Sequence, residues 1–230
     1  MLAHLGPDSS IHLALKICRW ESGTDVVVQL SGQYLEVQRQ TQTFKWEGGY
    51  SLVDFDVSVA HNAPLGSTTL KYDVSIHDVI VARIRLDIRI SGQLSSQEIT
   101  TTSCIPAQTA FASYASQDGS RVLDRIAAVK ISAGLDVWVD CLSLNPGDRW
   151  KSRLRQEIRQ RDLFLLFWSR HAKESPWVSW EWHTALEEKG EPALQLHPLD
   201  TPQEAPPPDE LKHLHFGDPT LLARKAFEQK

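Results

Sequence analysis

"DLFLLFWSRHAKESPWVSWEWHTALEEKG", residues 162–190, joins an apolar segment to a sequence with the features of a helix. The part "DLFLLFWS" is apolar at nearly every position, which is typical of a central strand in a parallel sheet that helices cover on both faces. Ser175 is a favourable N-cap, Pro176 suits the first helical position, and Gly190 ends the pattern. The stretch therefore predicts a buried strand followed by a helix, the repeating unit of an α/β fold.

The same alternation continues on both sides of this stretch. Apolar strands alternate with segments in which apolar residues recur at helical spacing. Such an order predicts a doubly wound parallel sheet with helices on both faces. The further predicted elements are strands at 109–115, 135–140, 193–199 and 214–216 and helices at 118–134, 148–161 and 218–230.

The first part of the chain has a different period. In "VARIRLDIRI", residues 81–90, apolar side chains alternate with polar ones, and segments 51–60 and 69–77 repeat this pattern. A period of two with one polar face predicts a half-solvated antiparallel sheet. About six short strands separated by turn residues predict a small antiparallel β-sandwich. The remaining predicted strands lie at 12–17, 25–30 and 34–44.

Composition excludes several classes of protein. The chain has 230 residues, a formal net charge of −5 and three scattered cysteines, Cys18, Cys104 and Cys141. The acidic balance argues against a nucleic-acid partner. The cysteine pattern argues against a disulfide framework and a zinc site, so we expect no metal and a cytoplasmic location. The first residues lack the features of a signal peptide, and no apolar stretch approaches the roughly 20 residues that span a bilayer, so no membrane partner is expected.

Candidate site residues follow from the predicted sheet, because ligands of such sheets bind at the carboxyl ends of the strands. Trp177 and Glu181 are four residues apart, so they share one face of the predicted helix near its N-terminus. An aromatic plane beside a carboxylate at this position suits a ligand with a flat ring and a phosphate. The other polar residues at strand ends are Ser113, Tyr114, Ser116, Asp140, Ser143 and Ser169.

Two other interpretations of the strand ends and helices are weaker. A phosphoacceptor site at Asp140 needs an acidic pair after the first strand of the predicted parallel sheet and a later lysine, but Asp118 is a single acid and no matching lysine follows a strand. The basic run "RWKSRLRQEIRQR" suggests nucleic acid, but Glu157 interrupts it. A solvated helix face is the better interpretation of that run.

Four segments in order resemble the successive boxes of a TIR (Toll/interleukin-1 receptor) domain: "AFASYASQD", "LDVWVD", "LNPGDRW" and "LFLLFWSRHAKESPWVSWEW". The resemblance implies a flavodoxin-like α/β domain over residues 108–230. A linker at 96–107 is then expected to join it to a sensor or partner-binding β-sandwich domain at 1–95. The segment after the last box is similar to that of stand-alone bacterial TIR proteins.

The resemblance also implies a reaction. Many plant, bacterial and axonal TIR domains cleave NAD+ between nicotinamide and ribose, giving nicotinamide plus ADP-ribose or a cyclic variant. It implies that Glu181 is the catalytic residue and that Trp177 lies beside the nicotinamide end of the substrate. NAD+ is then a substrate, and no cofactor is expected. Trp180 and Trp182 lie roughly 200° apart on a helix and are predicted mostly to pack.

A third implication is assembly, because TIR domains generally act through contacts with one another. We expect a homo-oligomer or filament in immune or anti-phage signalling, and a further partner or ligand of the β-rich domain. The expected assembly loop comprises Asn145, Pro146, Gly147 and Trp150. A non-catalytic scaffold that recruits partners through the same surfaces is the alternative, and replacing Glu181 would discriminate between the two.

Overall fold

The computed structural model describes residues 3–5, 9–16, 19–90, 106–139 and 148–214. It contains two compact units. The first comprises Met1–Pro106 together with Ser132–Gly134, and the second comprises Ala107–Ile131 together with Leu135–Lys230. Most of the predicted linker at 96–107 lies outside the described residues, so the domain boundaries remain a prediction. No described helix is long and apolar enough to cross a membrane.

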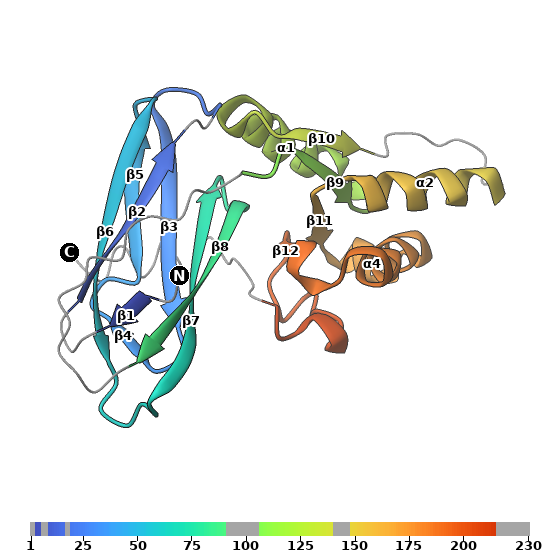
Figure 1. The fold of residues 1–230 in the computed structure, drawn as a ribbon. Helices are drawn as coiled ribbons and strands as arrows, with labels where there is room; N and C mark the ends of the chain where they lie inside the picture. Colours follow the sequence, from blue (N-terminus) through green and yellow to red (C-terminus); the bar gives the residue numbers. More distant parts are fainter. Residues whose placement is uncertain (1–2, 6–8, 17–18, 91–105, 140–147, 215–230) are drawn as a thin grey trace. The chain divides into compact units, whose positions relative to one another are not determined.

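The first unit is a β-sandwich (Figure 1). Its described strands form a five-stranded sheet in the order β1-β8-β7-β3-β5 and a three-stranded sheet in the order β2-β6-β4. The strands are β1 (Ala3–Leu5), β2 (Ser9–Lys16), β3 (Thr24–Gly32), β4 (Leu35–Val37), β5 (Thr41–Trp46), β6 (Tyr50–Val59), β7 (Gly66–Ile76) and β8 (Val79–Ile90). The pairing is antiparallel except at one edge, where β1 pairs with β8 in parallel.

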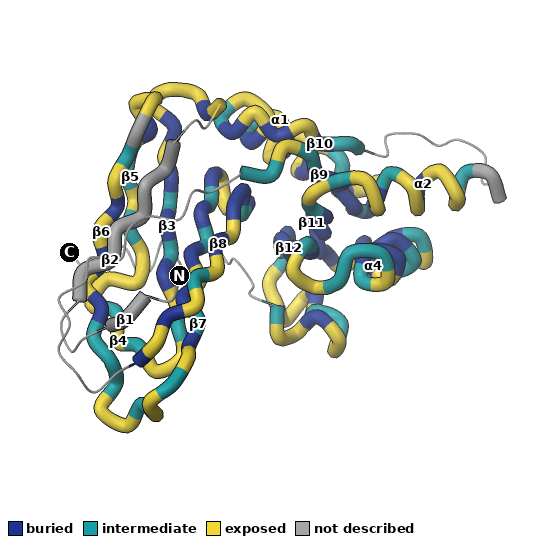
Figure 2. The backbone as a smooth tube through the Cα atoms, in the orientation of Figure 1, coloured by how far each residue is buried: buried dark blue, intermediate teal, exposed yellow. Residues whose placement is uncertain are grey.

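The predicted alternation along the strands of the sandwich is confirmed. In β7 the side chains of Leu70, Tyr72, Val74 and Ile76 are buried, while the residues between them are more exposed (Figure 2). The ring of Tyr72 meets that of Phe55 in β6 edge to face, with centroids 5.9 Å apart. Because β6 and β7 belong to different sheets, this contact lies between the inner faces of the sandwich.

The prediction of a single strand at 34–44 is wrong, because the segment forms two strands. β4 pairs with β6 of the smaller sheet, whereas β5 pairs with β3 of the larger sheet. The chain therefore crosses from one sheet to the other between Val37 and Thr41. The alternating pattern hides this crossing, because both strands keep the period of two.

The second unit is a parallel α/β sheet. Its described strands lie in the order β10-β9-β11-β12, and every neighbouring pair is parallel. This confirms the flavodoxin-like fold class. The strands are β9 (Thr109–Ser113), β10 (Asp136–Val139), β11 (Leu163–Trp168) and β12 (Leu194–Pro198). The helices are α1 (Gly119–Ala133), α2 (Asp148–Gln160), α3 (Arg170–Glu174) and α4 (Pro176–Lys189), with 3-10 turns η1 (Ser116–Asp118), η2 (Glu191–Ala193) and η3 (Asp209–Leu211).

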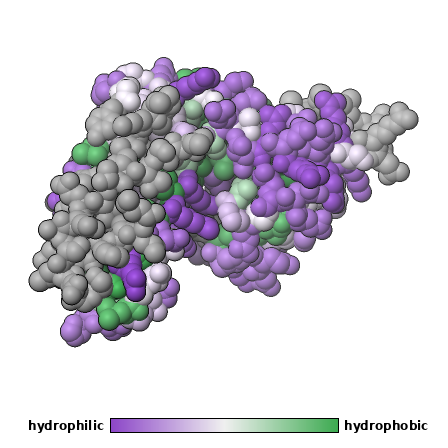
Figure 3. All heavy atoms as spheres, in the orientation of Figure 1, coloured by the Kyte–Doolittle hydropathy of each residue, from purple (hydrophilic) through white to green (hydrophobic). Residues whose placement is uncertain are grey.

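Hydrophobic burial explains why these elements form. β11 is buried at every position after Leu163, as a strand covered on both faces must be. The helices bury apolar residues at helical spacing and turn charged residues outward, so the visible face of this unit is mostly hydrophilic (Figure 3). Buried apolar residues of these helices include Val122, Ile126 and Val129 in α1, Leu154 and Ile158 in α2, and Val178, Trp182 and Ala185 in α4.

One helix of the second unit was not predicted, and two predicted elements lie almost wholly outside the described residues. The short helix α3 was not predicted, because the segment between Ser169 and Ser175 reads as a loop after the strand. Five residues are too few for a hydrophobic period to be recognised. The strand predicted at 214–216 and the terminal helix at 218–230 fall, except for Leu214, outside the described residues.

Candidate functional site

The two central strands of the parallel sheet define where a ligand site is expected. β9 and β11 are neighbours, but their connections leave in opposite directions. From β9 the chain runs through α1 to β10 on one side, and from β11 it runs through α3 and α4 to β12 on the other (Figure 1). The carboxyl ends of β9 and β11 therefore form a topological switch point, the usual ligand position in such sheets.

Ser113 and Glu181 meet at this switch point. Ser113 is the last residue of β9, and its hydroxyl donates a hydrogen bond of 2.6 Å to Oε2 of Glu181 in α4. The two residues are 68 positions apart in the sequence, and only 1% and 2% of their surfaces are exposed. A bond this short between a hydroxyl and a carboxylate is typical of a charge-assisted hydrogen bond.

Helix α4 begins in a way that fixes the position of Glu181. Ser175 accepts a hydrogen bond of 3.3 Å from the backbone N–H of Val178, and Pro176 occupies the first helical turn. Trp177, one turn before Glu181, is half-buried, and its ring stacks on that of Trp180 with centroids 5.5 Å apart. The Lys151 ammonium lies 5.9 Å from the centre of the Trp180 ring.

The three tryptophans of α4 have different environments. Trp182 is 3% exposed and belongs to the hydrophobic core of the unit. Trp177 and Trp180 pack against the edge of that core and keep part of their rings accessible. Trp177 lies one helical turn before Glu181, so the two residues share a face of α4, and the Trp177 ring is half-buried.

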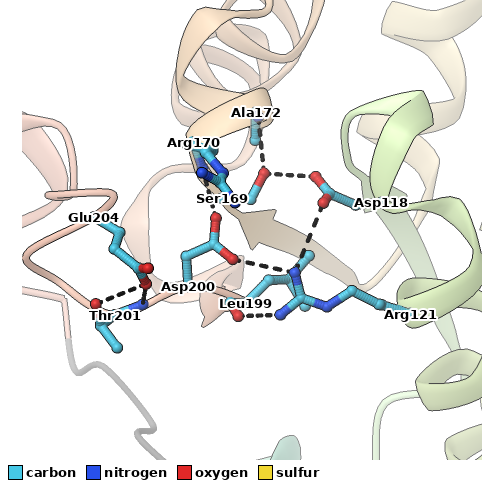
Figure 4. A network of polar contacts seen from close by, with 9 residues as sticks. All are labelled: Asp118, Arg121, Ser169, Arg170, Ala172, Leu199, Asp200, Thr201 and Glu204. Carbon is cyan, nitrogen blue, oxygen red and sulfur yellow. Dashed lines mark hydrogen bonds and ion pairs between the residues drawn. The ribbon is translucent and has the colours of Figure 1, made fainter.

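A second buried carboxylate lies at the same edge of the sheet. Ser169, just after β11, donates a hydrogen bond of 2.5 Å to Oδ2 of Asp118 and accepts one from the N–H of Ala172 (Figure 4). Arg121 reaches Asp118 at 3.9 Å and Asp200 at 3.1 Å. The network thus links the segments that follow β9, β11 and β12.

Sequence reasoning selected Ser169 but did not assign a site role to Asp118, Arg121 or Asp200. The partners Arg121 and Asp200 are 79 residues apart, and only the order of the strands brings them together. The pKa of Asp200 lies below its ordinary value, chiefly because the backbone N–H of Arg170 donates to it, with Arg121 adding to the effect. The usable signal for Asp118 was its place in the segment that follows the first strand of the parallel sheet.

The remaining predicted site residues are placed as follows. Tyr114 is half-buried after β9, and Ser116 is exposed in η1. Trp150 in α2 is half-buried, with the Arg153 guanidinium 5.9 Å from its ring centre. The other predicted residues, Asp140, Ser143, Asn145, Pro146 and Gly147, lie outside the described residues.

Other charged groups of the unit serve the fold. Arg155 of the basic run pairs with Glu187 and Glu188 of α4 at 3.3 and 2.9 Å. His197 in β12 is buried, and desolvation, together with the charge of Arg125, lowers its pKa to about 4. Within the described residues, no three His, Cys, Asp or Glu side chains are grouped as a metal site.

Comparison with known proteins gives one family. A family model described as TIR domain matches residues 111–229, just over half of the chain. No curated protein matches the sequence. Among solved structures, the chain is similar to the CupB2 chaperone of Pseudomonas aeruginosa (11% identity, 39% of this chain and 51% of that chain, TM-score 0.27). It is also similar to the periplasmic chaperone SfaE (9% identity, 48% of this chain and 61% of that chain, TM-score 0.30).

The chain thus spans between half and two thirds of the length of these chaperones, and the likeness assigns neither fold nor function to it. The match to the TIR family model agrees with the observed parallel sheet, at whose carboxyl edge Ser113 of β9 is bonded to Glu181 of α4. The chain belongs to the TIR domain family.

Proposed function

We propose that this protein cleaves NAD+ at the bond between nicotinamide and ribose, releasing nicotinamide and leaving ADP-ribose or a cyclic variant. The observation that carries the proposal is the buried pair of Ser113 and Glu181, 2.6 Å apart at the switch point of the sheet. Membership of the TIR family, which includes enzymes of this kind, supports it. We place the reaction in immune or anti-phage signalling.

A single carboxylate is sufficient for this chemistry. When the C1′–N bond breaks, its electron pair passes to the ring nitrogen, so nicotinamide leaves as a neutral ring and needs no acid. The ribose is left with oxocarbenium character, and a carboxylate stabilises the developing positive charge. Water then adds to C1′ and loses a proton, giving ADP-ribose, while attack by a group of the adenine end gives a cyclic product.

The residues around Glu181 have separate roles in the proposal. Glu181 holds the ribose hydroxyls and faces the developing charge. Ser113 donates to the carboxylate and keeps it at the end of β9. Trp177, half-buried and one turn earlier, offers an aromatic surface to the flat nicotinamide ring.

Burial links the reaction to assembly. Glu181 is only 2% exposed, so the groups that cover it must move before a substrate reaches it. We propose that association of several TIR units, as a homo-oligomer or filament, supplies this change. Activity is then low in dilute solution and rises when the protein is clustered, as expected when binding to a partner shifts a conformational equilibrium.

The experiment compares wild type with Glu181→Ala and a matched control. Each protein is incubated with NAD+, dilute and clustered on beads, and nicotinamide is followed by chromatography. The control is Glu187→Ala, which removes the same charge from an exposed position of the same helix. We expect release by wild type and Glu187→Ala and none by Glu181→Ala. Turnover by Glu181→Ala at the wild-type rate would show that the site is misassigned.

A non-catalytic scaffold is the second candidate, and one observation favours it. The hydrogen bond between Ser113 and Glu181 is fully buried, so it also ties α4 to β9 as a structural contact. Glu181→Gln keeps the side-chain shape and can still accept a hydrogen bond from Ser113, so a scaffold should tolerate this substitution. A cellular response, such as survival of phage infection, that persists unchanged in Glu181→Gln would favour the scaffold over the enzyme.

A further inference from the structure

The two central strands end in the same chemical arrangement. β9 ends at Ser113, which donates to Glu181, and β11 is followed by Ser169, which donates to Asp118 at 2.5 Å. All four side chains are buried, with at most 2% of each residue exposed. The proposed reaction uses the first pair and leaves the second pair without a role.

The second pair is connected to the helix that carries Glu181. Ser169 caps α3 by accepting from the N–H of Ala172 at 3.0 Å. The carbonyl of Ala172 accepts in turn from the N–H of Ser175 at 3.2 Å, and Ser175 caps α4. Glu181 lies less than two turns further along α4. The segment from Ser169 to Glu181 is thus bound to the β9–η1 segment at each end. Ser169 donates to Asp118 at one end, and Glu181 accepts from Ser113 at the other.

Asp118 is itself held, through Arg121, by the segment that follows β12. Its carboxylate lies 3.9 Å from Nη1 of Arg121, and the same nitrogen is 3.1 Å from Asp200 (Figure 4). Arg121 also donates to the carbonyl of Leu199, which follows β12. Asp200 accepts from the N–H of Arg170, the first residue of α3, at 2.9 Å. The position of α3 is therefore fixed by contacts from the segments that follow β9 and β12.

We infer that Asp118 is a positioning residue, which acts through Ser169 to hold the α3–α4 segment so that Glu181 lies against the end of β9. This inference rests on the proposed function, because the positioned group is its catalytic residue. Asp118 itself does not touch the substrate. A small displacement of a catalytic group lowers the rate steeply, by about 100-fold for 1 Å.

Two variants break the hydrogen bond between Ser169 and Asp118, and they differ in which other contacts they remove. Ser169→Ala removes both the bond to Asp118 and the cap of α3, whereas Asp118→Ala leaves the cap in place. Ser169→Thr keeps the hydroxyl and is the conservative variant. The rate of nicotinamide release is measured per folded molecule, in full-length clustered protein, with kcat and KM determined separately.

A matched control lies at the opposite end of the same strands. Thr109, at the start of β9, donates from its hydroxyl to Asp162 at 3.1 Å and accepts from the N–H of Asp162 at 3.0 Å. Thr109→Ala therefore removes a side-chain tie between the β9 and β11 segments, as Ser169→Ala does, but far from Glu181 in the sheet. It is expected to lower stability and to leave kcat unchanged.

We expect Ser169→Ala and Asp118→Ala each to lower kcat by at least about tenfold. The double variant should lose no more than the more severe single variant, since both substitutions break the same Ser169–Asp118 hydrogen bond. Ser169→Thr should restore the rate. If wild type is active and Ser169→Ala and Asp118→Ala stay within about twofold of it, the positioning role is overturned while the proposed reaction stands.

A second readout decides the matter if wild type releases no nicotinamide. Hydrogen exchange of the backbone amides in α4 reports how firmly the helix is held, whatever reaction it serves. Asp118→Ala should then speed exchange in the first two turns of α4, and Thr109→Ala should not. Equal protection of α4 in wild type and Asp118→Ala would overturn the positioning role independently of catalysis.

Discussion

We expect acid to destabilise the TIR unit through His197, because this residue is buried as a neutral imidazole. The imidazole is buried in β12, its Nε2 has no hydrogen-bond partner among the described residues, and its ring lies 5.3 Å from that of Phe167. Desolvation and the charge of Arg125 lower its pKa from 6.5 to about 4. The folded state therefore keeps this group neutral under conditions in which the unfolded chain protonates it.

The sign and magnitude follow from proton linkage. Well above pH 6.5 the imidazole is neutral in both states, so His197 has no effect on stability. Below that pH the unfolded state binds the proton, which lowers the free energy of the unfolded state. Between pH 7 and pH 5 the unfolding free energy falls by about 2 kcal/mol from this residue, and by about 3 kcal/mol once the pH is below the folded pKa. Stability that is present at neutral pH is thus lost as the pH falls from 6.5 towards 4.

The variant His197→Leu tests this reasoning. It fills a similar volume and does not titrate, so its loss of stability between pH 7 and pH 5 should be about 2 kcal/mol smaller than that of wild type. Urea unfolding followed by tryptophan fluorescence reports on this unit, which contains six of the eight tryptophans. Carboxylates such as Asp200 affect both proteins alike and cancel in the comparison. Equal acid sensitivity of the two proteins would refute the argument.

Three further variants test other parts of the fold by urea unfolding. Tyr72→Phe removes a buried hydroxyl without a partner among the described residues, so stability should be unchanged or up to about 1 kcal/mol higher; a clear loss would reveal a hidden partner. Asp162→Ala removes an acceptor of two backbone N–H groups and should cost about 1–2 kcal/mol at neutral pH, and no loss would contradict its role. Lys45→Ala breaks an exposed ion pair with Asp25 and should change stability by less than about 0.5 kcal/mol.

Local patterns predicted most of the elements correctly. Alternation in β7 and β8 and the apolar run of β11 depend on which face of a strand is buried, and this is visible in neighbouring residues. The caps of α4 were visible for the same reason, since Ser175, Pro176 and Gly190 act within one turn of the helix ends. The short helix α3 was missed because five residues are too few to show a period, and the split between β4 and β5 was missed because both strands keep the period of two.

The candidate site was only partly predictable. Ser113 and Glu181 were selected separately, one from a strand end and one from a helix face, and their hydrogen bond depends on how α4 packs over the sheet. The link from Asp118 to Ser169, and from Arg121 to Asp200, depends on the order of the strands, which local periodicity does not contain. Buried polar pairs of this kind follow from the tertiary fold and become visible only with it.

The most direct test of the central claim is nicotinamide release by wild type and Glu181→Gln at rising protein density on beads. Gln keeps the shape of the side chain and an acceptor for Ser113, so the fold stays intact while the negative charge is lost. The account predicts that release per wild-type molecule increases with density and that Glu181→Gln releases none at any density. Release by Glu181→Gln equal to that of wild type would contradict a catalytic role for this carboxylate.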